Sequence, residues 1–158
     1  MNAADIMTRD VATVLPTATL TEVARTMAAI SVRCLPVCEP DGMLVGIIAA
    51  CDLIRLPVRG REQRHDGWLH HLVDRKHFAE EFFYHVNGGE IYARDQMRTD
   101  VVTATETTPV EEIVDLMMMR DFNRVPIVRD GKLVGIVTRA DLVKMTMAPS
   151  KVVLGSRV

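Results

Sequence analysis

The sequence predicts an α/β (α+β) fold that contains two copies of one β-α-β-β-α unit, joined by a helical linker. The first observation is an internal repeat, because "GMLVGIIAACDL" at residues 42–53 recurs as "GKLVGIVTRADL" at residues 131–142. The second is that each copy alternates short β-branched runs with segments whose apolar residues recur at helical spacing. A chain of 158 residues, 48% of them hydrophobic, is long enough to bury a core in each of two small units.

The repeat sets the predicted domain boundaries. Residues of the first copy recur 90 positions later up to Pro36, which matches Pro126, and 89 positions later from Gly46, which matches Gly135. A fixed period of this kind indicates that each copy is one structural unit. The boundaries that follow are a first domain, a helical linker, a second domain and a flexible tail, over residues 1–56, 57–92, 93–147 and 148–158.

Each element of the second copy has its own signal. "DVVTA" (100–104) is a β-branched run that predicts a strand, and "TPVEEIVDLMMMR" (108–120) spaces its apolar residues at helical intervals. Thr108 and Glu111 predict the start of that helix, because Thr can cap a backbone amide and Glu can reach back to the cap. "RVPIV" and "LVGIV" then predict two strands around the turn "RDGK", and a second helix opens near Asp141.

The composition excludes several classes of partner. With 19 basic and 21 acidic residues the formal charge is −2, so the chain lacks the net positive charge that binds nucleic acid or an anionic membrane. The longest apolar run, "LVGIIAAC", is far shorter than the roughly 20 residues that span a bilayer. The N-terminal residues lack a secretory signal, and the cysteines form an odd set of three, Cys34, Cys38 and Cys51. We therefore expect reduced thiols and a cytoplasmic location.

Two motifs make the repeat specific to a family. The copies open with "DIMTRDVATV" (5–14) and "DQMRTDVVTA" (95–104), and each continues later through "LVGI" to an Asp-Leu pair. This pattern resembles a tandem pair of cystathionine-β-synthase (CBS) domains, and the resemblance covers both halves of the chain. It implies a pseudo-twofold pair of units, a homodimer, and a regulatory role in signal transduction. The implied regulatory ligand is an adenosine nucleotide or derivative (AMP, ADP, ATP, NAD or S-adenosylmethionine), with no other cofactor required.

The resemblance places this ligand in the groove between the two domains, mainly at a site formed by the second copy. A ribose presents two vicinal hydroxyls, and one ionised carboxylate can accept a hydrogen bond from each, so Asp141 is the candidate ribose anchor. Thr138 is a candidate for contact with ribose or phosphate, and Arg139 is a candidate for contact with phosphate. By position, the groups that seat adenine in the family are Val102, Thr103, Val125 and Pro126. Alternatively, Thr138 and Asp141 only cap the last helix, although capping is compatible with ribose binding.

The first copy predicts a weaker site. It keeps Asp52 but carries Ala49 where the second copy has Thr138, and Ala50 where the second copy has Arg139. Two of the three polar groups are therefore missing. The residues left to form an adenine and ribose pocket are Thr13, Leu35, Pro36 and Asp52, with phosphate bound by Arg33 or by the other half of the chain. Whether this site is occupied remains open at this point.

The predicted linker helix holds all the histidines, which are His65, His70, His71, His77 and His85. Their spacing does not place a set of zinc ligands on one helical face, so we predict a solvated surface and no metal. No nucleophile and base recur at a usable spacing, which predicts a binding module rather than an enzyme. The alternative function is a ligand-free structural module that dimerises, or docks an unknown effector protein, through the linker helix.

Overall fold

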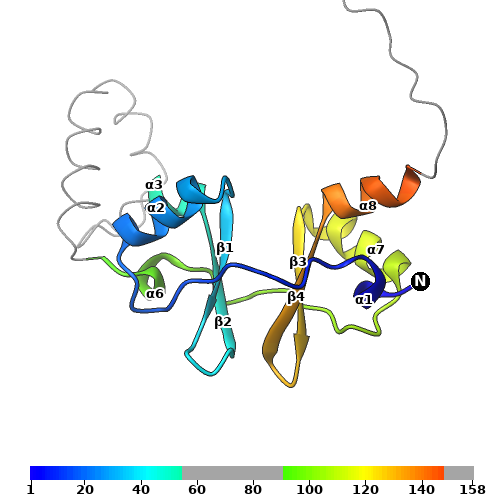
Figure 1. Ribbon diagram of the computed structural model, residues 1–158, viewed down its shortest axis with the longest axis horizontal. Helices are drawn as coiled ribbons and strands as arrows, with labels where there is room; N and C mark the ends of the chain where they lie inside the picture. The colour runs from blue at the N-terminus through cyan, green and yellow to red at the C-terminus, as the bar shows by residue number, and fades with distance from the viewer. Residues whose placement is uncertain (55–90, 148–158) are drawn as a thin grey trace, which may run out of the picture. The chain divides into compact units, whose positions relative to one another are not determined.

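A computed structural model describes residues 1–54 and 91–147 (Figure 1). The predicted tail, the predicted linker helix up to residue 90, and the histidines in it lie outside the described residues. Before the linker the elements are α1 (Ala3–Ile6), α2 (Leu20–Ala29), β1 (Cys34–Cys38), β2 (Leu44–Ala49) and α3 (Ala50–Ile54). After it they are α6 (Ala93–Gln96), α7 (Val110–Arg120), β3 (Arg124–Arg129), β4 (Lys132–Thr138) and α8 (Arg139–Thr146).

The two predicted hairpins are confirmed, and they share one register. β1 pairs antiparallel with β2 and β3 with β4, so that Pro36 lies opposite Ile47 and Pro126 opposite Ile136. Each hairpin shifts register at the same repeat position, after Val37 in β1 and after Ile127 in β3. The repeat in the sequence is therefore a repeat of backbone geometry down to the irregularity in each ladder.

The first predicted strand of each unit is reduced to a single bridge. Ala104, the last residue of "DVVTA", pairs in parallel with Ile127, and Val14 pairs in the same way with Val37. Ala104 donates its amide to the carbonyl of Pro126 at 3.0 Å and accepts from the amide of Val128 at 2.9 Å. The three residues before each bridge therefore add no strand to the sheet.

The two long helices begin differently, and the prediction for one of them is wrong. Thr19 caps α2 in a capping box, in which the amide of Glu22 donates to its hydroxyl at 3.2 Å and the Glu22 carboxylate accepts from the amide of Thr19 at 2.8 Å. In α7 the cap position is Pro109, which offers no side-chain acceptor. The hydroxyl of Thr108 instead accepts from the amide of Thr105 at 3.0 Å, so Thr108 closes the preceding turn.

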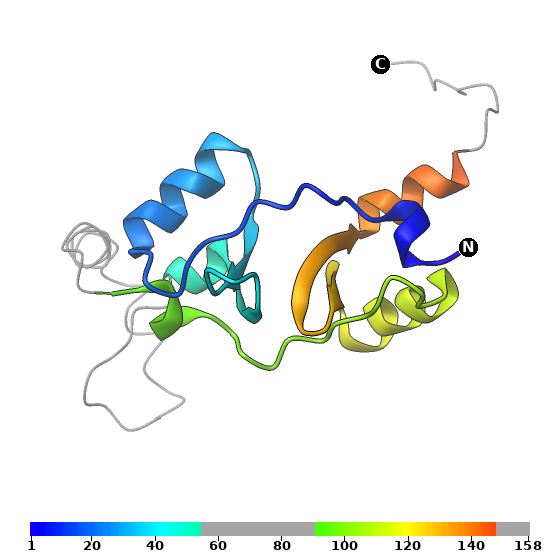
Figure 2. The same ribbon diagram turned by 60° about the horizontal axis from the view of Figure 1, so that its bottom comes forward.

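The chain forms two compact units that exchange their opening segments. The first unit comprises Ala12–Val101, and the second comprises Met1–Val11 together with Val102–Val158. In the second unit Thr8 pairs with Ile136 of β4, with mutual amide-to-carbonyl distances of 2.9 Å. In the first unit Arg98 pairs with Ile47 of β2 in the same way. The segment that opens each repeat therefore packs on the hairpin of the other repeat; α1 lies beside α8 and β4 (Figure 2).

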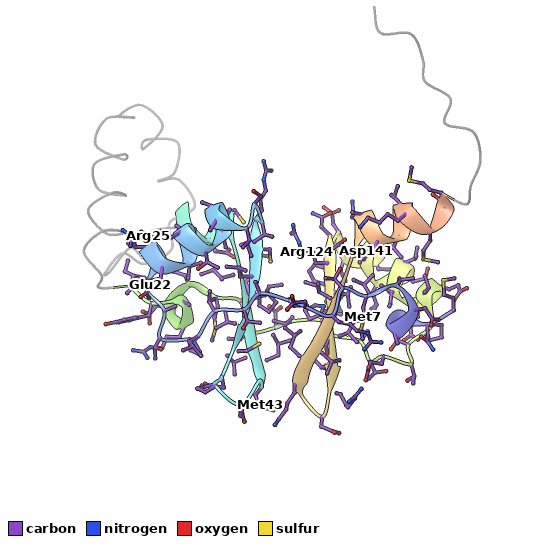
Figure 3. All side chains as sticks on the ribbon, in the orientation of Figure 1. Met7, Glu22, Arg25, Met43, Arg124 and Asp141 are labelled. Atoms are coloured by element: carbon purple, nitrogen blue, oxygen red, sulfur yellow. The ribbon has the colours of Figure 1, made fainter. Side chains whose placement is uncertain are left out.

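This exchange explains the glycine within each "LVGI". A Cβ on Gly135 would lie 2.5 Å from the sulfur of Met7 and 3.1 Å from the carbonyl oxygen of Thr8. A Cβ on Gly46 would lie 2.6 Å from the sulfur of Met97 and 2.9 Å from the carbonyl oxygen of Arg98. Only a residue without a side chain admits the exchanged segment this close to the strand. Figure 3 labels Met7 beside β4.

Each unit has its own hydrophobic core, which fixes the hairpin against the helices. Both cores combine the inward faces of the hairpin and of the long helix with an alanine of the exchanged segment. The buried members in the first unit are Val14, Leu20, Val23, Met27, Leu35, Val37, Ile48, Leu53, Ile91 and Ala93. Those in the second are Ala3, Met7, Ala104, Ile113, Met117, Val125, Ile127 and Val137.

Candidate functional site

The end of β4 and the start of α8 bring Thr138 and Asp141 into direct contact. Thr138 is the cap of α8, and its hydroxyl accepts from the amide of Asp141 at 3.3 Å. The same hydroxyl donates to Oδ2 of Asp141 at 2.7 Å, and the amide of Thr138 donates to that oxygen at 2.9 Å. The capping interpretation is therefore confirmed, and it engages one of the two carboxylate oxygens.

The other oxygen of Asp141 has a weaker partner. Its Oδ1 lies 3.4 Å from the Nζ of Lys144, whose side chain is 75% exposed. An exposed lysine at this distance contributes little to stability and can move away. Asp141 therefore combines a carboxylate that is fixed through Oδ2 with an acceptor, Oδ1, that is able to receive hydrogen bonds from a ligand.

Burial sets these aspartates apart from other charged groups. In the part of the chain that the structure describes, the charged side chains that are buried are Asp52 and Asp141, which occupy equivalent repeat positions. A buried carboxylate is costly unless it is hydrogen-bonded or paired. Helix capping is one structural use of such groups. Two buried carboxylates at equivalent repeat positions are also candidate acceptors for a ligand.

Two arginines lie near the second site, and the phosphate-binding role predicted for Arg139 stays a prediction. The guanidinium of Arg139 pairs with Asp121 at 3.0 Å and donates to the carbonyl of Phe122 at 3.3 Å, so it is directed to the turn between α7 and β3. Arg124, which sequence reasoning missed, opens β3 directly opposite Thr138. Figure 3 labels Arg124 and Asp141 at the same end of the hairpin. The structure shows no hydrogen bond or ion pair of its side chain with another described residue.

The residues predicted to seat adenine are divided between core and surface. Val125 has no exposed surface and packs in the core of the second unit, and Pro126 is buried next to it in β3. Val102 is half-buried and Thr103 is exposed, just before the bridge at Ala104. Within this set, Val102 and Thr103 have solvent-exposed surface that a ligand could contact. Val125 instead packs in the hydrophobic core.

The equivalent place in the first unit is built differently. Oδ2 of Asp52 accepts from the amide of Ala49 at 2.8 Å, but there is no hydroxyl to add the second hydrogen bond that Thr138 supplies. Oδ1 of Asp52 lies 3.5 Å from both Nε and Nη2 of Arg98. Of the other predicted residues, Leu35 and Pro36 are buried in β1, and Thr13 is exposed. Arg98 was not predicted, because only the exchanged segment carries it to Asp52.

The described residues include three cysteines and no cluster of metal ligands. All three cysteines are thiols rather than disulfides: Cys34 is half-buried, Cys38 buried and Cys51 exposed. Burial raises the pKa of the Cys38 thiol above its ordinary value, so it stays protonated. Within residues 1–54 and 91–147, no group of three His, Cys, Asp or Glu side chains is arranged to hold a metal ion. Nor is any described helix long and apolar enough to cross a bilayer.

The chain belongs to the CBS domain family, whose model matches residues 3–59 and 89–147. An uncharacterised protein of Methanocaldococcus jannaschii is 33% identical over 141 residues, which are 89% of this chain and 45% of that relative. The chain thus spans about half the length of this relative. What the whole relative does is therefore not transferred to this chain.

Solved CBS-pair structures share the fold. The structure of CBSX2 in complex with AMP has a TM-score of 0.69 and 24% identity, covering 92% of this chain and 96% of that one. The CBS domain pair of the protein MJ0100, in complex with 5′-methylthioadenosine and S-adenosyl-L-methionine, has a TM-score of 0.65 and 22% identity, covering 92% and 95%. The predicted family and the predicted α+β tandem architecture are both confirmed.

Proposed function

We propose that this chain is a regulatory module that binds an adenosine nucleotide or derivative, mainly at the second unit, and that it catalyses no reaction. Asp141 accepts hydrogen bonds from the ribose hydroxyls through Oδ1, while Thr138 holds the carboxylate in place through Oδ2. Thr138 is thus a positioning residue, since its hydroxyl hydrogen is already donated to Asp141. The observation that carries the proposal is this buried carboxylate with one oxygen fixed and the other held only by an exposed lysine.

Two further features support an adenosine ligand. Arg124 lies at the same end of the hairpin as Asp141 and supplies a cation for phosphate, a role that Arg139 does not fill while it pairs with Asp121. The CBS-pair neighbours were solved with AMP and with adenosine-containing sulfur compounds, all of which carry a ribose. At their level of identity the likeness shows the fold, so the ligand class is our proposal and the particular adenosine compound is left to experiment.

The proposal includes signalling through a homodimer in the cytoplasm. The outer face of α7 exposes Val114, Met118 and Met119, the two methionines by 75% and 83%. Apolar side chains grouped on one helix commonly mark an interface between proteins. A second copy of the chain is the occupant we propose, because the matching helix α2 carries small residues at the equivalent positions. A ligand that favours one arrangement of the dimer would then alter its shape.

Isothermal titration with AMP, ADP, ATP, NAD and S-adenosylmethionine tests the ligand class. We expect at least one of these to bind, and adenosine itself to bind more weakly than its phosphates because it lacks the group that Arg124 meets. Guanosine monophosphate is the matched control for the base. If none of the adenosine compounds binds or raises the melting temperature at millimolar concentration, the ligand-free structural module becomes the better description.

A further inference from the structure

We infer that Arg98 closes the first site by taking the place of a ribose on Asp52, so that this unit binds no nucleotide. The inference rests on the proposed function of Asp141 in the second unit, and it assigns to Arg98 the role of a specificity-determining residue. The absence of nucleotide at the first site then has a cause besides the missing hydroxyl at Ala49. A side chain of the same chain already occupies the acceptor.

The contact between Arg98 and Asp52 uses the groups that ribose binding would need. A guanidinium offers a fork of N–H donors to a carboxylate, just as a ribose offers two neighbouring hydroxyls. Here Nε and Nη2 of Arg98 both lie 3.5 Å from Oδ1 of Asp52, the oxygen that the backbone does not engage. Oδ1 of Asp52 thus faces two donor nitrogens, whereas Oδ1 of Asp141 faces one, and the side chain of Asp52 is 4% exposed against 10% for Asp141.

The backbone of Arg98 is fixed to β2 by a pair of hydrogen bonds, which places the start of its side chain near Asp52. Its carbonyl accepts from the amide of Ile47 at 3.0 Å, and its amide donates to the carbonyl of Ile47 at 2.9 Å. Gly46 allows this close approach, because any side chain at that position would meet Met97 and the Arg98 carbonyl. Arg98 is therefore anchored to β2 at Ile47. This residue lies three positions before the start of α3, the helix that carries Asp52.

The second unit lacks an equivalent of this closure. Thr8 occupies the matching position on β4, with the same pair of backbone hydrogen bonds to Ile136, and no contact of its side chain with Asp141 is seen. The cation near Asp141 is instead Lys144, which is attached to the same helix and is 75% exposed, against 48% for Arg98. The two repeats thus carry the same buried aspartate with different cations on Oδ1: Arg98 of the exchanged segment in the first unit, and Lys144 of the same helix in the second.

The test opens the first site with the residue of the other repeat. Arg98→Thr copies Thr8, and Arg94→Thr is the matched control, because it removes the same charge from an exposed position on the same segment. Titration with AMP is done on the parent, on both variants, and on each of them combined with Asp141→Asn. We expect one site per chain in the parent and a second in Arg98→Thr. Arg98→Thr with Asp141→Asn should bind AMP at least about tenfold more tightly than Asp141→Asn alone or with Arg94→Thr. Equal binding by these three would overturn the inference.

A ligand-free measurement separates this inference from the proposed function. Thermal unfolding is followed for Arg98→Thr and Asp52→Asn, singly and together. If the side chains are paired, Arg98→Thr lowers the melting temperature more in the parent than in the Asp52→Asn background. Identical shifts in the two backgrounds would show that the two side chains are not energetically coupled and would overturn the closure. If the pair is present but the parent binds no adenosine compound, the proposed function fails while the contact stands; the closure of a ribose site is then also refuted.

Discussion

The hydroxyl of Thr138 donates to Oδ2 of Asp141 at 2.7 Å and accepts from the amide of Asp141 at 3.3 Å, so that each residue fixes the other. Capping and ligand binding are often treated as alternatives for such a pair. Here they divide the carboxylate between them, because capping uses Oδ2 and leaves Oδ1 facing only Lys144. A substitution that preserves one oxygen and replaces the other therefore separates the two roles.

Asp141→Asn is that substitution. The asparagine oxygen can still accept from Thr138, so the free energy of unfolding should change by less than about 1 kcal/mol. The amide nitrogen in place of Oδ1 is a donor and cannot accept hydrogen bonds from the ribose hydroxyls. Nucleotide affinity should therefore fall at least about 30-fold. Titration calorimetry and urea unfolding of the same preparations measure both quantities.

Asp52→Asn is the matched control for this experiment. Because Arg98 already engages Asp52, the control should leave nucleotide affinity within a factor of about two of the parent. If the two variants lose the same affinity, the asymmetry between the units is wrong. If Asp141→Asn binds normally, Asp141 is a cap and nothing more.

Ala49→Thr should stabilise the first unit without creating a nucleotide site. A hydroxyl at this position can donate to Oδ2 of Asp52 as Thr138 does to Asp141, and a helix cap of this kind contributes about 0.5 to 2 kcal/mol. Arg98 still covers Oδ1, so AMP stoichiometry should not change. The gain in unfolding free energy is measured in urea, with Ala49→Ser as a second capping variant. A rise in AMP stoichiometry for Ala49→Thr alone would show that the missing hydroxyl, and not Arg98, limits the first site.

The sequence could predict the hairpins and the contact between Thr138 and Asp141, because both depend on residues close together in the chain. Turn glycines between β-branched runs specify a hairpin, and a Thr three residues before an Asp at a helix start specifies a capping box. The family followed from the same short motifs. These features need no knowledge of how distant segments pack.

The partner of Asp52 could not be predicted in this way. Arg98 is 46 residues away from Asp52, and its position depends on which hairpin the opening segment of the second repeat packs against. The repeat pattern is the same whether each opening segment stays with its own hairpin or is exchanged. The partner of Arg139 could not be predicted either, since it depends on the position of Asp121 after α7. Local signals predict the positions of the aspartates, and tertiary contacts decide which cation meets Asp52.

Gly135→Ala tests the exchange of segments. The added methyl group would lie 2.5 Å from the sulfur of Met7, so either Met7 or the opening segment must move, at a cost of about 1–3 kcal/mol. Met7→Ala truncates a core residue and is destabilising by itself, but in that background Gly135→Ala should cost less than in the parent, although the carbonyl oxygen of Thr8 at 3.1 Å remains. Urea unfolding measures the difference. If Gly135→Ala is neutral, the opening segment does not pack against β4 in solution.

Arg124 and Arg139 make opposite predictions for phosphate. Arg124→Ala should weaken binding of AMP about tenfold while leaving the affinity for adenosine unchanged, because only AMP carries the group that the guanidinium meets. Arg139→Ala should change AMP affinity by less than about twofold, since its guanidinium is engaged by Asp121 and the Phe122 carbonyl. Both variants remove one positive charge, so each controls for the other. The reverse result would restore Arg139 as the phosphate-binding residue.

The proposed homodimer has a preferred pairing of helices, which can be tested by exchanging charges. Asp115 of α7 and Arg25 of α2 occupy equivalent repeat positions and are both exposed; Figure 3 labels Arg25 on α2. The neighbouring positions pair large residues of α7 with small residues of α2: Val114 with Ala24, Met118 with Ala28 and Met119 with Ala29. If α7 of one copy packs on α2 of the other, Asp115 meets Arg25, and the methionines of α7 fill the space beside the alanines of α2. If α7 packs on α7 instead, the two Asp115 carboxylates meet and repel each other.

We therefore expect Asp115→Arg to weaken dimerisation at least about tenfold, because like charges then meet at both ends of a twofold interface. Adding Arg25→Asp to the same chain should restore most of the affinity by reversing the pair. Glu39→Arg makes the same change of charge in the β1–β2 turn and should leave the dimer intact. Sedimentation velocity over a range of micromolar concentrations gives the dissociation constants. A monomeric parent would refute the homodimer, whereas a dimer that tolerates Asp115→Arg and is not rescued by the reversed pair would refute the packing of α7 on α2.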